Sequence, residues 1–250
     1  MPRLHDLGPR ARLGQALPGA QRAARARRAP DQAGALHDGR GPAPRTGRGA
    51  RVSEGAAGLL LASTSPRRAR LLSEAGIAFR AASPGVGDAD EEELERDLCA
   101  QGLSPAAVVE RLALAKLCAG LRLARAGERV LAADTTVAFG PRLLGKAKDE
   151  RLARETLELL RGREHQVHSG VAIADARGRV RSGVATSTVV FREFTSDELT
   201  TFLASGVWRG KAGAYGVQDP EAAPLVEEVR GSRSNVIGLP LELVQELLAS

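Results

Sequence analysis

LLLASTSPRR, residues 59–68, joins a short apolar run to three consecutive hydroxyl residues and two arginines. The apolar run, 59–62, is typical of a short buried strand. Ser65 suits the N-cap of a helix and Pro66 suits its first position, so we expect a helix to follow and to stop at Gly76. The stretch therefore predicts a strand, a tight turn and a helix, a unit typical of α/β folds.

The turn between this strand and this helix favours phosphate binding. Ser63 and Ser65 supply hydroxyls, and the helix N-terminus supplies backbone N–H groups and the positive end of the helix dipole. Arg67 and Arg68 add two guanidinium groups, which can bind phosphate through paired N–H donors. A well-capped helix with two solvated arginines is the plainer alternative that these residues leave open.

The composition indicates a core of aliphatic residues. Of the 250 residues, 43% are hydrophobic but only 3% are aromatic, so Leu, Val and Ala must fill the core. We find no apolar run of about 18 residues, as a membrane-spanning helix would need, and no apolar segment of a secretory signal. Cys99 and Cys118 have no metal-like spacing, and we expect a reducing, cytoplasmic location.

The basic character of the chain belongs to its first 55 residues. They hold 11 arginines and 4 acidic residues, whereas residues 56–250 have a net charge of −1, which does not imply a nucleic-acid surface there. Residues 1–55 are rich in Arg, Ala, Gly and Pro without hydrophobic periodicity, so we predict a disordered extension. It could be a basic arm for nucleic acid or membrane, a transit peptide, or the product of a start assigned too early, with the true start near Val52. Its composition favours the last of these.

Residues 56–250 form one predicted domain in which strands and helices alternate. Strands are expected at 58–63, 79–82, 129–139, 166–174, 180–191 and 225–229, and helices at 66–75, 105–126, 150–160, 197–204 and from 240 to the C-terminus. An acidic loop, 83–97, and a Gly-rich segment, 210–218, lie between them. The turn at 175–178 makes the strands on either side of it antiparallel. This pattern predicts an α/β fold with a mixed, twisted sheet flanked by helices.

Asp134 gives the clearest chemical indication of any single residue. It follows the apolar run 130–133, so its carboxylate lies inside or at the end of a buried strand. A carboxylate there needs a metal, a cationic partner or a titrating role. Thr135 and Thr136 place hydroxyls beside it. The alternative is an Asp that caps a turn at the end of the strand.

Two other patterns suggest sites that we do not adopt. GPRLLGK, residues 140–146, matches the first seven positions of a P-loop, but Ala147 stands where Ser or Thr would contact Mg²⁺. We reject the P-loop and keep Lys146 as a candidate phosphate-binding lysine on a turn. His165 and His168 are three residues apart in a predicted strand and face opposite sides, which argues against a metal pair.

Two further segments could border a ligand. The Gly-rich segment 210–218, GKAGAYGVQ, permits close backbone approach, and the amide of Gln218 could read a base edge because it both donates and accepts hydrogen bonds. A flexible turn between core elements is the alternative. The charged part of the acidic loop begins at Asp88. Most of its carboxylates are expected to be solvated, and one or two are expected to lie near a metal–phosphate site.

Together these segments resemble the Maf family of nucleoside triphosphate pyrophosphatases, from about Leu59 to Leu248. The segments that carry the resemblance are LLLASTSPRRARLL at 59–72, VVERLALAK at 108–116, VLAADTTV at 130–137, LLGK at 143–146, GREHQVHSGVAI at 162–173, GKAGAYGVQ at 210–218 and SNVIGLPL at 234–241. The match is specific because all of these segments occur in the family's order, whereas no single segment would be specific alone.

The resemblance implies a fold related to the inosine-triphosphate pyrophosphatases. It implies hydrolysis between the α- and β-phosphates, which gives a nucleoside monophosphate and pyrophosphate, and a divalent cation, Mg²⁺ or Mn²⁺. Asp134 resembles the catalytic proton acceptor of the family, and whether it acts as the base or binds the metal stays open. The other matching positions are Ser63, Arg67 and Arg68 in the phosphate turn, Lys116 and Lys146 in the cleft, and Asp88, where the family usually has Glu.

Arg67, Thr135 and Gln218 resemble the branch of the family that prefers dTTP and UTP, and not the 7-methyl-GTP branch. We therefore expect a dTTP/UTP pyrophosphatase that also clears modified nucleotides, with a nucleoside triphosphate as its partner and a homodimer as the assembly common in the family. The alternatives are a pyrophosphatase for another nucleotide, such as 7-methyl-GTP, and a non-enzymatic regulator of septum formation. Ala147 departs from the family's usual proline, which is expected to loosen that turn, and residues 1–55 have no counterpart.

Overall fold

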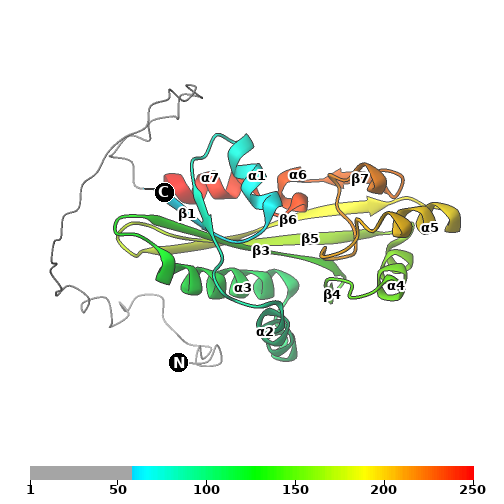
Figure 1. Cartoon of the computed structure of the whole chain (residues 1–250). Coiled ribbons are helices and arrows are strands. Elements are labelled where there is room, and N and C mark those ends of the chain that lie inside the picture. Colours follow the sequence, from blue (N-terminus) through cyan, green and yellow to red (C-terminus); the bar gives the residue numbers. More distant parts are fainter. Residues whose placement is uncertain (1–57) are drawn as a thin grey trace, which may run out of the picture. The chain divides into compact units, whose positions relative to one another are not determined.

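The computed structural model, which describes residues 58–250, is built on a seven-stranded mixed sheet (Figure 1). Its order is β2-β1-β3-β5-β6-β7, and β4 pairs with β3 away from this path. The strand β1 is parallel to both of its neighbours, whereas β3, β5, β6 and β7 are successively antiparallel. The predicted mixed sheet flanked by helices is confirmed. The predicted disordered extension, residues 1–55, lies outside the described residues.

The elements have the following bounds. The strands are β1 Leu59–Ala62, β2 Arg80–Ala82, β3 Arg129–Phe139, β4 Arg142–Leu144, β5 Glu164–Ala174, β6 Val180–Phe191 and β7 Val226–Arg230. The helices are α1 Pro66–Glu74, α2 Asp88–Ala100, α3 Pro105–Gly120, α4 Glu150–Leu160, α5 Ser196–Ser205, α6 Arg233–Ile237 and α7 Leu241–Ala249, with short 3₁₀ turns η2 Leu121–Leu123 and η3 Pro220–Ala222.

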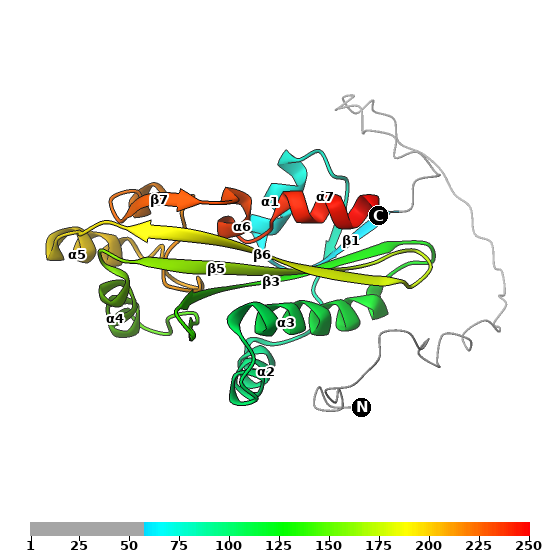
Figure 2. The same cartoon turned by 180° about the vertical axis from the view of Figure 1, so that it is seen from behind.

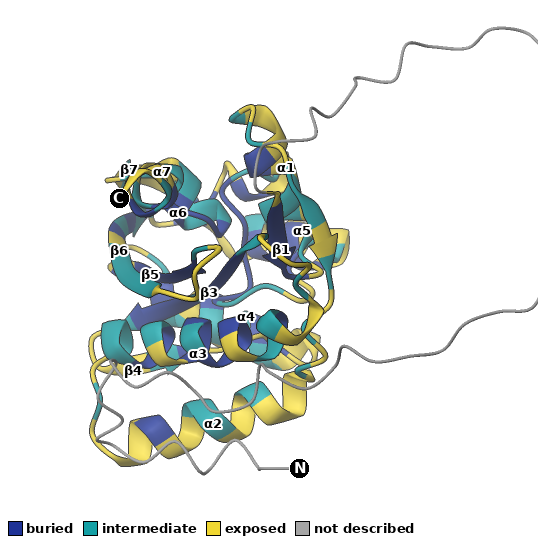
Figure 3. Ribbon diagram, turned by 90° about the vertical axis from the view of Figure 1, so that its left-hand side faces the viewer, coloured by how far each residue is buried: buried dark blue, intermediate teal, exposed yellow. Residues whose placement is uncertain are grey.

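The sheet is covered by helices on both faces because the side chains of each strand alternate between two cores (Figures 1 and 2). Leu60 and Ala62 of β1 pack in a core with α3, whereas Leu59 and Leu61 pack in a core with α1 and α7. This alternation explains why LLLA is apolar at every position. Figure 3 shows the consequence, with buried strands in the middle and the outer sides of the helices exposed.

The acidic segment that we predicted as a loop, 83–97, is largely the helix α2, so that prediction was wrong. The carboxylate of Asp90 accepts a hydrogen bond from the backbone N–H of Gly87 at 3.3 Å, which caps the helix. Acidic residues in the first turn also interact favourably with the helix dipole. Leu98 then packs against Val108 and Leu112 of α3. These effects outweigh the low apolar content of the segment.

Three smaller differences concern element ends. The helix expected over 105–126 is α-helical only to Gly120, because the backbone N–H of Arg125 already bonds the side chain of Glu128 at 2.9 Å in the turn that leads into β3. The helix expected at 197–204 begins one residue earlier, at Ser196, with Thr195 as its capping residue. The short elements β4 and α6 were missed, because three to five residues carry too little periodicity to be recognised.

Described residues contain no helix that is both long and apolar enough to cross a membrane. The two cysteines, Cys99 and Cys118, are free and exposed.

One close approach fixes α3 on the sheet. A Cβ atom added at Gly170 of β5 would lie 2.5 Å from the carbonyl oxygen of Val109 and 2.9 Å from the Cα of Glu110. Gly170 is also the residue that pairs with Asp134 of β3. The missing side chain therefore lets α3 lie against the sheet beside Asp134.

We expect Gly170→Ala to destabilise the protein by about 1–3 kcal/mol, because the methyl group meets rigid backbone and forces α3 to move. Urea unfolding measures this change. Gly183→Ala is the matched control in β6, since the new Cβ would meet only a flexible end of Leu243, at 3.1 Å. Equal stability losses in the two variants would show that α3 is not held by this approach.

His165 is a buried core histidine. Its side chain is 2% exposed, its Nε2 lies 2.7 Å from the hydroxyl of Tyr215, and its ring packs edge-on against Phe191. Burial lowers the pKa of His165 from 6.5 to about 4. The imidazole is therefore neutral in the folded protein at pH values where the unfolded chain already binds a proton.

This pKa difference predicts acid sensitivity. Between pH 6.5 and about 4 the unfolded state gains the proton of His165 and the folded state does not, so stability is complete above pH 6.5 and falls as the pH is lowered to about 4. The loss reaches roughly 3 kcal/mol. Urea unfolding at several pH values should give a shallower slope in His165→Gln, which cannot titrate. An unchanged slope would contradict the assignment.

Candidate active site

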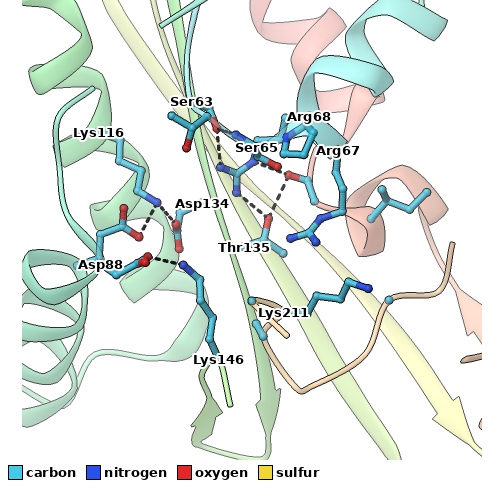
Figure 4. A pocket seen from close by; sticks show the side chains of 18 of the residues that line it. Ser63, Ser65, Arg67, Arg68, Asp88, Lys116, Asp134, Thr135, Lys146 and Lys211 are labelled. Carbon is cyan, nitrogen blue, oxygen red and sulfur yellow. Dashed lines mark hydrogen bonds and ion pairs between the residues drawn. The ribbon is translucent and has the colours of Figure 1, made fainter. Parts of the chain in front are cut away.

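The candidate site lies at an interruption in the sheet. On one edge of β3, pairing with β1 ends at Leu131 and pairing with β4 begins at Val137. Between these points the edge of β3 has no neighbouring strand, and a cavity of about 530 Å³ opens beside it. Asp134 and Thr135 lie in this interval. Because α1 begins a few residues after β1 ends, its N-terminus forms the rim of the same cavity (Figure 4).

The cavity brings together every residue that the sequence indicated. Its lining includes Ser63, Ser65, Arg67, Arg68, Asp88, Lys116, Asp134, Thr135, Lys146 and Gln218. These residues come from the turn between β1 and α1, from α1, α2, α3 and β3, and from the segments after β4 and α5, so only the fold unites them. Two charged lining residues were not singled out, Glu91 and Lys211. Both lie in the two segments that were expected to border a ligand, the acidic segment and the Gly-rich segment 210–218, but the sequence did not distinguish them from their neighbours.

An ion-pair cluster forms the deepest part of the cavity. The ammonium of Lys116, on α3, lies 2.5 Å from Oδ1 of Asp134 and 2.9 Å from Oε2 of Glu91 (Figure 4). The residues Lys116 and Asp134 are 8% and 9% exposed, so each charge depends on the other for its stability. The second oxygen of Asp134, Oδ2, makes no hydrogen bond with any described residue. It is therefore available as an acceptor toward the cavity.

Lys146 forms a second, more exposed pair at the mouth of the cavity. Its ammonium donates to Asp88 at 2.6 Å, and the two side chains are 49% and 75% exposed. The hydrogen bond from Lys146 lowers the pKa of Asp88. The backbone of Lys146 pairs with Ala212, and Ala147 is buried in the core, so this turn is held without the proline usual in the family.

The segment 140–146 is not a P-loop. It contains the strand β4, which pairs antiparallel with β3, and the next helix, α4, begins only at Glu150. A P-loop would pass directly into a helix. The rejection of the P-loop is therefore confirmed.

The two arginines of the phosphate turn have different surroundings. Arg68 donates from Nε to the carbonyl of Gly238 at 2.9 Å, and its Nη groups lie 3.3 and 3.4 Å from the hydroxyls of Ser63 and Thr135. Desolvation lowers the pKa of Arg68, and the charge of Asp134 opposes this shift. Arg67 makes no hydrogen bond or ion pair within residues 58–250, and its side chain extends into the open space of the cavity (Figure 4).

The N-terminus of α1 is also left open to the cavity. Ser65 occupies the N-cap as predicted, but its side chain makes no capping hydrogen bond. The first N–H groups of a helix have no intrahelical acceptor, so those of Arg67 and Arg68 are free for a ligand. With the helix dipole behind them, they favour an anion at this rim.

Thr135 connects the phosphate turn to β5 and to the segment after α6. Its hydroxyl lies 2.8 Å from that of Ser169 and 3.2 Å from the carbonyl of Gly238. Asp134 and Thr135 are adjacent in β3, so they point to opposite faces, the first toward α3 and the second toward α6. One strand thus presents a carboxylate and a hydroxyl on the two sides of the same gap.

The two histidines do not form a metal pair. His165 bonds Tyr215 in the core, whereas Nδ1 of His168 lies 2.9 Å from the hydroxyl of Thr186. Within residues 58–250 no three His, Cys, Asp or Glu side chains are grouped to hold a metal on their own. The carboxylates of Asp134 and Glu91 still suit Mg²⁺ or Mn²⁺, because such ions are commonly held by one or two carboxylates together with substrate phosphates.

The charges of the cavity define the class of ligand. Five cationic side chains line it, Arg67, Arg68, Lys116, Lys146 and Lys211, against the carboxylates of Asp88, Glu91 and Asp134. Together with the helix N-terminus, this excess suits a compact polyanion such as a polyphosphate. The fold and the site thus define an α/β protein with a cationic cavity at an open strand edge.

Comparison with known proteins gives the family. The family described as Maf-like protein matches residues 58–250. A dTTP/UTP pyrophosphatase of Desulfitobacterium hafniense is 42% identical over 196 residues, which cover 76% of this chain and 84% of that protein. One of Paramagnetospirillum magneticum is 42% identical over 193 residues, with coverages of 76% and 95%. This chain therefore belongs to the Maf-like family, and the resemblance seen in its sequence is confirmed.

A solved structure of the Staphylococcus aureus Ham1 protein also matches, with a TM-score of 0.40 and 12% identity over 76% of this chain and 97% of that one. A similarity this weak supports no conclusion about function.

The contrast between the arginines predicts that only the loss of Arg68 lowers the stability of the protein. We expect Arg68→Ala to lower the free energy of unfolding by about 2–3 kcal/mol, because it removes a charged donor from Gly238 and Thr135. Arg67→Ala should leave stability within about 0.5 kcal/mol of wild type. Urea unfolding compares the two directly, each serving as the control for the other. Equal losses would mean that Arg68 does not organise the turn.

Proposed function

We propose that this protein hydrolyses dTTP and UTP to the nucleoside monophosphate and pyrophosphate. The observation that carries the proposal is a buried carboxylate, Asp134, held by Lys116 with one free oxygen in a cationic cavity. The names of the similar proteins support the same reaction and the same nucleotides. A cytoplasmic location and a homodimer stay predictions from the sequence.

Phosphate binding would begin at the rim of the cavity. The free N–H groups of α1 and the guanidinium of Arg67 can donate hydrogen bonds to phosphoryl oxygens without breaking any bond of the ligand-free protein. Lys146 can turn from Asp88 to a phosphate at little cost, because an exposed ion pair contributes only about 0–1 kcal/mol. A bound divalent cation would neutralise further phosphate charge, and Glu91 together with the substrate phosphates would hold it. Asp134 would bind the cation only in the alternative in which this carboxylate is not the base.

Asp134 is positioned to act on the attacking water. Lys116 fixes Oδ1, so Oδ2 is the oxygen that can accept a proton from a water molecule in the cavity. The water oxygen then bonds to the α-phosphorus, and the bond from that phosphorus to the α–β bridging oxygen breaks. The electron pair of this bond leaves with pyrophosphate, which Arg67 and Lys146 neutralise.

Recognition of the nucleobase is proposed to involve Gln218 and Thr135, two of the positions that resemble the dTTP/UTP branch. Gln218 lines the cavity, and Thr135 lies at its floor within the Arg68 network. A pyrophosphatase acting on 7-methyl-GTP or another nucleotide is the alternative that a substrate panel separates. A non-enzymatic regulator would need no free Asp134 oxygen and no unpaired Arg67.

The first test measures pyrophosphate release from dTTP, UTP, CTP and 7-methyl-GTP with Mg²⁺. We expect turnover of dTTP and UTP, and a fall of about 10³-fold in kcat for Asp134→Asn with the fold retained, because the amide cannot accept the proton. Asp197→Asn is the matched control, since Asp197 is exposed on α5 and does not line the cavity. Near-full turnover in Asp134→Asn would refute the role of this carboxylate. Absence of turnover on every nucleotide would favour the regulator.

A further inference from the structure

The side chain of Gln218 is held by its neighbour, Asp219. The Nε2 of Gln218 donates to Oδ1 of Asp219 at 2.9 Å, and the other carboxylate oxygen, Oδ2, is paired with the ammonium of Lys211. The side chains of Lys211 and Asp219 are 13% and 19% exposed, so the pair is largely shielded from solvent. Sequence reasoning gave no indication of this chain of three residues.

The backbone around Gln218 is fixed as well. The N–H of Asp219 bonds the carbonyl of Gly216 at 3.0 Å, and Arg233 donates to the carbonyl of Val217 at 2.8 Å. A Cβ at Gly216 would lie 2.4 Å from Nε2 of Gln218 and 2.5 Å from Oδ2 of Asp219. Only glycine leaves room for the two side chains to meet here. The segment is therefore not the flexible turn that was the alternative for 210–218, but a packed support for Gln218.

A carboxylate beside an amide decides which way the amide faces. The oxygens of an ion-paired carboxylate only accept hydrogen bonds, so the neighbouring amide must present its NH₂ group to them. Turning the amide of Gln218 over would place Oε1 against Oδ1 of Asp219, oxygen against oxygen. The bond to Asp219 therefore leaves Oε1 as the acceptor of Gln218, together with the second hydrogen of Nε2.

We propose that Asp219 is a positioning residue that orients the Gln218 amide, and that this orientation selects uracil and thymine over cytosine. The inference rests on the proposed function, since it names the feature of the substrate that this site reads. Uracil and thymine carry an N3–H donor beside a carbonyl, which matches an oxygen acceptor beside an N–H. Cytosine carries an N3 acceptor beside an amino group and needs the amide turned over.

The test compares kcat/KM for UTP and CTP in wild type and in Asp219→Asn. An Asn side chain can present either its oxygen or its NH₂ group, so it no longer dictates how Gln218 faces. We expect the UTP-to-CTP ratio to fall at least tenfold. A residue that merely stabilised the loop would lower both values alike and leave the ratio unchanged. Asp197→Asn is again the matched surface control, with an expected wild-type ratio.

A double-mutant cycle shows whether Asp219 acts through Gln218. Gln218→Ala alone should lower the UTP-to-CTP ratio of kcat/KM to the same extent. Adding Asp219→Asn to this variant should not change the ratio further. A further fall in the double variant, or a wild-type ratio in Asp219→Asn, would overturn the proposal. If Asp219→Asn does not fold, Gln218→Ala still tests the proposal. A wild-type UTP-to-CTP ratio in Gln218→Ala would show that this amide does not recognise the nucleobase.

Calorimetric binding of UMP and CMP to the same variants separates this inference from the proposed reaction. If wild type releases no pyrophosphate, the proposed function fails. The UMP-to-CMP affinity ratio then tests the orientation of Gln218 by itself, with a tenfold loss expected in Asp219→Asn and an unchanged ratio refuting it.

Discussion

The structure of the site depends on one buried ion pair, that between Lys116 and Asp134. Removing one partner of a buried pair costs about 3–5 kcal/mol where the other charge is left without compensation. Loss of Lys116 would leave Asp134 in this state, whereas Lys116 keeps its pair with Glu91 when Asp134 is replaced. The environment of the pair consists of the apolar residues of β3 and α3. The helix can supply the lysine only because it approaches the sheet at Gly170, where no side chain intervenes. The position of the carboxylate and the packing of α3 are therefore two aspects of the same constraint.

The unpaired edge of β3 makes the region around Asp134 accessible to a ligand. A long strand whose partner ends early has unpaired edge positions, and most sheets cover them. In this protein β1 stops at Ala62 and the chain turns into α1, so the exposed edge and a helix N-terminus border the same space. Adjacent residues of β3 then reach it from both faces, a carboxylate from one and a hydroxyl from the other. The site arises from a missing strand pairing more than from any added loop.

Much of this could be predicted from the sequence, because local patterns carried it. The SPRR turn, the bounds of β3 and the isolated acid within an apolar run at Asp134 depend on capping, periodicity and the cost of burying a charge. The helix α2 escaped prediction, since its stability depends on a capping carboxylate and on contacts between Leu98 and α3. Glu91 and Asp219 were missed for a related reason. The partner of Glu91, Lys116, is distant in the sequence, and Lys211 meets Asp219, eight residues on, only because the Gly-rich segment folds back on itself.

Lys116 and Lys146, which the sequence does not distinguish, differ in whether a ligand can displace them from their carboxylate partners. Lys146 is half exposed and its pair with Asp88 contributes little, so a phosphate can replace the carboxylate without disturbing the fold. Lys116 is buried between two carboxylates, and moving it to a phosphate would leave Asp134 and Glu91 facing each other uncompensated. Lys116 therefore belongs to the framework that positions Asp134, and Lys146 to the part of the cavity that exchanges partners. A cation arriving with the phosphates would meet carboxylates that are already fixed in place, which is the condition for ordering a flexible triphosphate.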